Sequence, residues 1–245
     1  MYIDFKRLSE EMKHPLWHLY WAPIMKELAA LKETAEHEYE ALKEDVYDFF
    51  EGQLLHSGVV LGKEVGIWDD ERTQVDTAVI HHTSNHEWIS LERLSAIELA
   101  RIYAPAYASP AEGDKAKMSG KPISSGHVYD GKQMFWTYHY LVRPDGSYVP
   151  LLRPSEVGWH AGLWSTNLRS IAIVLDGDYE NEKPSEKMLL TVAKLVGNNS
   201  INKEKVLGHN EVRPDRVPQV LCPSRLFLSR DGVRGWKEDL LELVA

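Results

Sequence analysis

The sequence predicts an α/β fold: a central mixed β-sheet flanked by helices, preceded by an N-terminal helical extension. Two short runs, residues 77–81 and 170–175, consist mainly of β-branched and apolar residues, which is typical of buried strands. Helical patterns alternate with strand-like patterns from residue 77 onward, and a long helical pattern fills most of the first 55 residues. We therefore expect an extension over residues 1–70 and a second domain over residues 71–245.

The N-terminal region carries one apolar stripe. From Ile24 to Phe49 apolar side chains recur every three or four residues, and the opposite face is rich in Glu and Lys. Pro23 is expected in the first turn of this helix, with a shorter helix before it. We interpret the region as an accessory helical layer packed on the second domain. The alternative is a coil that serves self-association or targeting.

The second domain is expected to begin with a strand that places His81 at its carboxyl end. A long irregular segment over residues 104–130 interrupts the pattern, and loops of this length are often functional. The other expected elements are a helix over 90–103 capped by Ser90, a hairpin that turns at 143–146, a strand over 170–175, a helix over 184–196 with Ser185 as candidate cap, and a closing helix over 235–244.

Composition limits the classes of function. The chain has 245 residues, 43% of them hydrophobic, which is enough to bury a full core. A formal net charge of −9 argues against nucleic acid or an anionic membrane as the main partner. The single cysteine excludes an intrachain disulfide, and no stretch reaches the roughly 18 apolar residues of a membrane span. The charged first residues contain no secretory signal, so we expect synthesis in the cytoplasm.

Three residues far apart in the sequence are of the types that bind zinc. His81 ends the first strand-like run, His209 follows Gly208, and Cys222 is the only cysteine. A catalytic zinc site uses three such ligands and leaves the fourth tetrahedral position open, whereas the ligands of a zinc finger come in close pairs. The spacing therefore indicates a site assembled by folding. The alternative is a buried histidine with an inert buried thiol.

Several short segments occur together in a fixed order: residues 79–83, 138–142 with Asp145-Gly146, 158–162, 167–173, 208–212 and Cys222-Pro223. On these segments the chain, from about residue 77 to its end, resembles the zinc-dependent N-acetylmuramoyl-L-alanine amidase family (amidase type 2), which includes phage T7 lysozyme and the peptidoglycan recognition proteins. The resemblance implies a Zn²⁺ cofactor and hydrolysis of the amide between N-acetylmuramic acid and L-alanine. The expected substrate is peptidoglycan or a soluble muropeptide, in wall lysis, remodelling or recycling.

The resemblance also implies roles for single residues. His81, His209 and Cys222 would bind zinc, and Tyr138 would be catalytic, since a phenol can donate a hydrogen bond to an oxyanion or orient water. His160 is a second catalytic candidate, with an outer-sphere or proton-transfer role as the alternative. His82 is expected to point to the opposite face of the strand from His81 and to have a structural role. The candidate substrate contacts are Asn167, Trp159, His82 and Arg213.

One position departs from the family pattern. Many relatives carry a basic residue two positions before the third ligand, where this chain has Val220. Arg213, Arg216 or Gln219 are candidates to take its place. Two other readings stay open: a non-catalytic module that recognises peptidoglycan, and a protein-interaction role for the N-terminal helices with a purely structural zinc. An amidase without a signal can still act at the cell wall after its release.

Overall fold

The computed structural model describes residues 1–56, 59–63, 68–85, 87–108, 120–214 and 220–244. These residues form two compact units. The helical unit consists of Met1–Gly66 and Ser90–Trp136, and the sheet unit consists of Ile67–Ile89 and Thr137–Ala245. The helical unit thus combines the start of the chain with a segment that interrupts the sequence of the sheet unit. The division at residue 70 stays a prediction about domain organisation.

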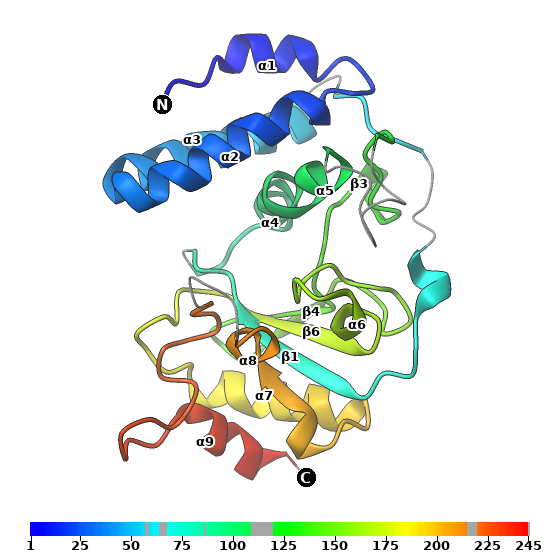
Figure 1. Cartoon of the computed structure of the whole chain (residues 1–245). Helices are drawn as coiled ribbons and strands as arrows, with labels where there is room; N and C mark the ends of the chain where they lie inside the picture. Colours follow the sequence, from blue (N-terminus) through cyan, green and yellow to red (C-terminus); the bar gives the residue numbers. More distant parts are fainter. Residues whose placement is uncertain (57–58, 64–67, 86, 109–119, 215–219, 245) are drawn as a thin grey trace. The chain divides into compact units, whose positions relative to one another are not determined.

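The helical unit is built on a pair of long helices, α2 (His18–Thr34) and α3 (Glu36–His56). The ring of Trp21, near the start of α2, lies 4.7 Å from that of Phe50, near the end of α3, so the two helices run antiparallel (Figure 1). The expected continuous stripe is broken at Ala35, whose φ of −154° and ψ of 72° are not helical. Pro23 lies inside α2 and not in its first turn, because α2 begins at His18.

The inserted segment adds short elements to this helix pair. Ser90 caps α4 by accepting a hydrogen bond from the backbone N–H of Arg93, as predicted. The Arg93 guanidinium then reaches Glu44 and Asp48 of α3 at 2.6 and 2.5 Å. The elements of this unit besides α2 and α3 are α1 (Phe5–Glu11), α4 (Leu91–Glu98), the π-helical η2 (Leu99–Tyr103), α5 (Ala104–Ala108), β2 (Val128–Tyr129) and β3 (Lys132–Gln133).

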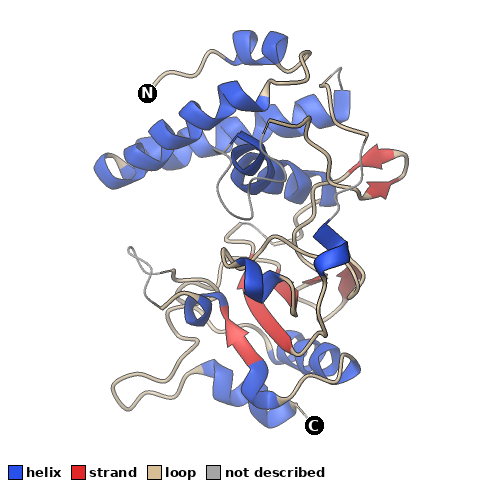
Figure 2. Ribbon diagram, turned by 45° about the vertical axis from the view of Figure 1, so that its right-hand side comes forward, coloured by secondary structure: helices blue, strands red, loops and turns tan. Residues whose placement is uncertain are grey.

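The sheet unit contains a five-stranded mixed sheet with the strand order β5-β4-β6-β1-β7, which confirms the predicted fold class (Figure 2). Strand β1 is parallel to both β6 and β7, β4 is parallel to β6, and only β5 is antiparallel to its neighbour. The hairpin predicted around residues 143–146 joins β4 to β5. The strands are β1 (Thr77–His82), β4 (Tyr140–Val142), β5 (Tyr148–Pro150), β6 (Ser170–Leu175) and β7 (Val206–Gly208).

Alternation along the strands gives the sheet two different faces. Ala78, Ile80, Ile171 and Ile173 belong to an apolar core with α7 (Glu186–Asn198) and α9 (Trp236–Leu243), which lie together beside the sheet (Figure 1). Ser185 caps α7 by accepting from the N–H of Met188, as predicted. The residues next to these core positions, including His81 and Ser170, point to the other face. The remaining elements are η1 (Trp68–Glu71), α6 (Trp164–Asn167), η4 (Lys203–Lys205) and α8 (His209–Val212).

No described helix is both long enough and apolar enough to cross a lipid bilayer.

Candidate functional site

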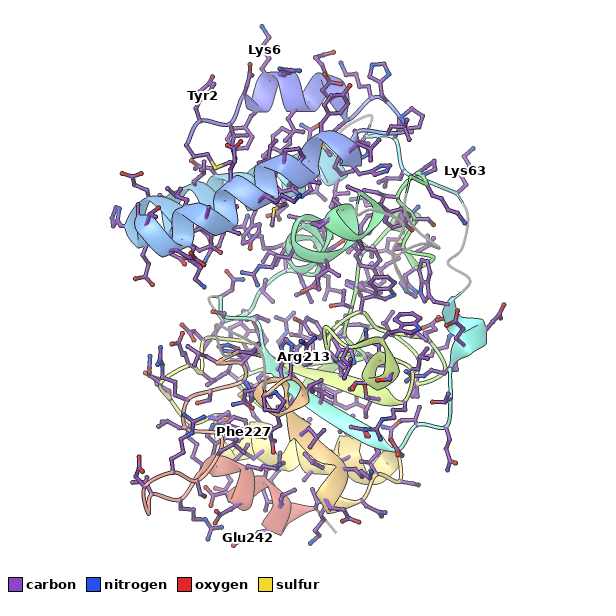
Figure 3. The ribbon with its side chains drawn as sticks, in the orientation of Figure 1. Tyr2, Lys6, Lys63, Arg213, Phe227 and Glu242 are labelled. Atoms are coloured by element: carbon purple, nitrogen blue, oxygen red, sulfur yellow. The ribbon has the colours of Figure 1, made fainter. Side chains whose placement is uncertain are left out.

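The pairing of β1 with β7 brings His81 and His209 together. Ile80 is opposite Gly208 in this parallel pair. The residues that follow them, His81 and His209, therefore lie side by side at the carboxyl ends of the two strands. The two imidazole rings have their centroids 4.7 Å apart. Gly208 permits this arrangement, because a Cβ there would lie 2.6 Å from the ring of Phe227 (labelled in Figure 3). A larger residue before His209 would push β7 away from its packing partner.

Cys222 joins the two histidines from the following loop. Its carbonyl accepts a hydrogen bond from the N–H of Asn210 at 2.8 Å, which ties the loop to α8. The Cys222 Sγ lies 3.6 Å from the Nδ1 of His81. One donor atom from each of His81, His209 and Cys222 lies within 4.8 Å of the others. The structure therefore assembles the three residues predicted as metal ligands.

These donor atoms fit a zinc ion. With a Zn–N distance of about 2.0–2.1 Å and a Zn–S distance of about 2.3 Å, a tetrahedral angle separates the nitrogen and sulfur by roughly 3.5–3.6 Å. The observed separation of His81 Nδ1 and Cys222 Sγ, 3.6 Å, agrees with this value. Two imidazoles and one thiolate leave one tetrahedral position for another ligand, which is the pattern of catalytic zinc sites.

The electrostatic environment keeps His81 in the form that binds metals. The side chain is only 1% exposed. Burial, reinforced by the neighbouring His209, His160 and His82, holds the pKa of His81 well below its usual range. The imidazole is therefore neutral near pH 7, and a neutral ring nitrogen is the atom that coordinates a metal.

Tyr138 and His160, the predicted catalytic residues, both lie next to His81. The Tyr138 ring is 5.1 Å from the His81 ring between centroids, and the side chain is partly exposed. His160 is buried, and its Nδ1 is 3.0 Å from the Nε2 of His81. Burial is the main cause that holds the pKa of His160 well below its usual range, so it too is neutral.

A network of hydrogen bonds fixes the segment that carries His160. The side-chain oxygen of Asn167 accepts from the backbone N–H groups of His160 and Ala161, at 3.3 and 2.9 Å. Asn167 is itself buried, so its side chain is engaged in holding the backbone. The half-buried Arg72 donates to the carbonyl oxygens of Asn167 and Ser170 at 2.6 and 2.9 Å. Burial lowers the pKa of Arg72 to about 10, so Arg72 is still charged at neutral pH.

The other candidate substrate residues have varied surroundings. His82 is buried on the face opposite His81, where its Nδ1 accepts from the N–H of Tyr179 at 3.0 Å. Trp159 packs between Trp68 and Trp164, with ring centroids 6.0 and 5.2 Å away. Arg213 follows the last residue of α8 (labelled in Figure 3). Their roles toward a substrate stay predictions, and Arg216 and Gln219 lie outside the described residues.

Two residues of the site had no role in the sequence analysis. Ser170 bonds to His160 from the start of β6, and its only signal was a hydroxyl at the head of an otherwise apolar run. Arg72 had no local signal, because its partners at Pro154, Asn167 and Ser170 are more than 80 positions away. Both act through contacts that exist only in the folded chain.

Comparison with known proteins gives one family. The model of a family described as N-acetylmuramoyl-L-alanine amidase matches residues 71–225, more than half of the chain. No curated protein shows a significant match.

One similar solved structure is the endolysin amidase LysCS of Clostridium intestinale, which is 19% identical with a TM-score of 0.42. The match covers 63% of this chain and 78% of LysCS. The endolysin of the Thermus scotoductus bacteriophage Ph2119 is 17% identical with a TM-score of 0.45, and the match covers 71% of this chain and 86% of the endolysin. Drosophila PGRP-LB is 22% identical with a TM-score of 0.41, and the match covers 73% of this chain and 92% of PGRP-LB.

Proposed function

Because the chain belongs to the N-acetylmuramoyl-L-alanine amidase family, we propose that it is a zinc-dependent hydrolase of peptidoglycan or muropeptides. The bond cleaved is the amide between N-acetylmuramic acid and L-alanine. The observation that carries this proposal is the group of His81, His209 and Cys222 at the edge of the sheet, with Tyr138 beside it. A recognition module needs no three-ligand site with an open position, so this group favours hydrolysis.

Each residue of the site has a chemical task in this reaction. His81, His209 and Cys222 hold the zinc ion, which when bound supplies a Lewis acid that polarises the carbonyl and acidifies water. Tyr138 is partly exposed next to His81, which supports a role for its phenol as a hydrogen-bond donor to the oxyanion that develops on the substrate. His160 contacts His81 and orients it.

The second donor to the oxyanion is a separate part of the proposal. Val220 cannot donate a hydrogen bond from its side chain. Arg213, at the end of α8, is the described residue that we propose for this task, because its guanidinium carries a permanent charge and follows the helix that begins with His209. The place in the cell where the chain acts stays a prediction.

The test is digestion of purified peptidoglycan with the zinc-loaded protein, followed by mass spectrometry of the soluble products. The proposal predicts stem peptides with free L-alanine amino termini and glycan strands that have lost their peptides. His209→Ala and Cys222→Ser should lose both zinc and product. His37→Ala is the matched control, because His37 is exposed on α3. Binding of peptidoglycan without any new amino termini, at full zinc occupancy, would establish the recognition module instead.

A further inference from the structure

The hydroxyl of Ser170 fixes the direction of a hydrogen-bond chain that leads to His81. Its Oγ lies 2.7 Å from the carbonyl oxygen of Thr166 and 3.1 Å from the Nε2 of His160. A carbonyl oxygen only accepts, so the single hydroxyl proton goes to Thr166. The Ser170 oxygen must then accept from His160, and His160 carries its proton on Nε2.

The same reasoning continues from His160 to His81. A neutral imidazole with its proton on Nε2 has an acceptor at Nδ1. This Nδ1 lies 3.0 Å from the Nε2 of His81, so His81 donates from Nε2. The lone pair of His81 is thereby left on Nδ1, and Nδ1 is the atom that lies 3.6 Å from the sulfur of Cys222.

We propose that Ser170 and His160 are positioning residues that hold His81 as the Nε2–H tautomer, with Nδ1 directed at the metal. The proposal rests on the proposed function only in taking zinc as the metal. Outer hydrogen-bond partners of this kind fix the tautomer and ring orientation of a ligating histidine. In this chain the direction of the whole series is set by a backbone carbonyl at the end of α6, which cannot change its role.

The fold places each member of the chain in reach of the next. Ser170 is the partner of Thr77 in the register of β1 and β6, four residues before the level of His81. Both side chains point to the face opposite α7, because His81 and Ser170 are each one position from a core residue on the α7 side, Ile80 and Ile171. His160 bridges this gap, since the Asn167 side chain holds its backbone above the strands.

The first test is a variant that removes the acceptor. In Ser170→Ala the buried N–H at His160 Nε2 has no acceptor from residue 170, which favours movement of the proton to Nδ1. Thr166 keeps another partner, because its carbonyl also accepts from the N–H of Arg169 at 3.1 Å. Competition with a coloured chelator should show zinc affinity reduced by about 10–100-fold, the usual effect of losing such a partner.

Two variants separate positioning from general loss of stability. Ser95→Ala is the matched control, because Ser95 is a buried serine of the helical unit that accepts from the N–H of Phe135 at 2.9 Å. It should retain zinc affinity. His160→Asn keeps an oxygen acceptor for His81 and should bind zinc more tightly than His160→Ala. Equal zinc affinity in Ser170→Ala and wild type would overturn the proposal, as would equal affinity in the two His160 variants.

The second test reads the tautomer directly in the wild-type protein. Long-range proton–nitrogen NMR should show His81 and His160 both protonated on Nε2 in the metal-free chain, and zinc should shift the Nδ1 resonance of His81. Protonation of His81 on Nδ1 would overturn the proposal even if Ser170→Ala fails to fold. Neither test needs catalysis, so a protein that binds zinc in this way but cleaves no peptidoglycan would contradict only the proposed function.

Discussion

Replacement of Arg72 by alanine should destabilise the sheet unit strongly. Its guanidinium donates four hydrogen bonds to the carbonyl oxygens of Pro154, Asn167 and Ser170. The two bonds to Pro154 are exposed, whereas those to Asn167 and Ser170 are partly buried. Hydrogen bonds from a charged donor contribute about 1.5–3 kcal/mol each, so the two partly buried bonds set an expected loss of about 3–6 kcal/mol.

Equilibrium unfolding in urea, followed by tryptophan fluorescence, measures this loss. Arg72→Lys should lose less than Arg72→Ala, because an ammonium keeps one or two of the bonds but cannot reproduce the planar fork. Arg153→Ala is the control, because its side chain is 80% exposed and its ion pair with Glu156 is screened by solvent. A loss in Arg72→Ala no larger than that in Arg153→Ala would refute the reasoning.

Three further predictions concern single side chains. Tyr138→Phe should keep zinc affinity and slow hydrolysis about 10²–10³-fold if the phenol stabilises the oxyanion; unchanged turnover in a peptide-release assay would remove Tyr138 from the mechanism. Asp176 is fully buried and bonds to Arg143 at 2.5 Å and to the N–H of Trp88 at 2.7 Å, so Asp176→Ala should cost about 3–5 kcal/mol in urea unfolding. The double variant Arg143→Met/Asp176→Leu should recover part of this loss. A loss of stability in the double variant equal to the sum of the losses in the two single variants would argue against a charge effect. His18 is fully buried. Burial lowers the pKa of His18 below the value of about 6.5 expected in the unfolded chain, so the unfolded chain binds more protons and stability falls as pH drops below that value. Wild type should therefore lose more stability than His18→Phe between about pH 7 and about pH 5, and parallel pH curves would contradict this.

The sequence predicted those parts of the site that depend on local pattern. The β-branched run before His81 indicated a buried strand, and strand alternation placed His81 and His82 on opposite faces, where the structure has them. The three candidate ligands followed from the chemistry of zinc. In each case the signal lay within a few residues of the side chain concerned.

The parts that sequence did not predict depend on contacts between distant segments. Ala35 separates α2 from α3, yet alanine favours helix, so nothing local marks the break. Residues 90–136 belong to the helical unit. One of the contacts that join them to α2 is the hydrogen bond from Trp21 to the carbonyl of Ala100, which no periodicity reveals. Likewise, the role of Ser170 follows only from the position of His160, which a loop brings to it.

The central claim is that one zinc ion held by His81, His209 and Cys222 is required for amide hydrolysis. The most direct measurement is a titration of metal-free protein with zinc, with the release of stem peptides that have a free L-alanine amino terminus followed at each addition. Release should rise with added zinc and level off at one ion per chain, and Cys222→Ser should give no release at the same total zinc. Release by the metal-free chain, or full release by Cys222→Ser, would contradict it.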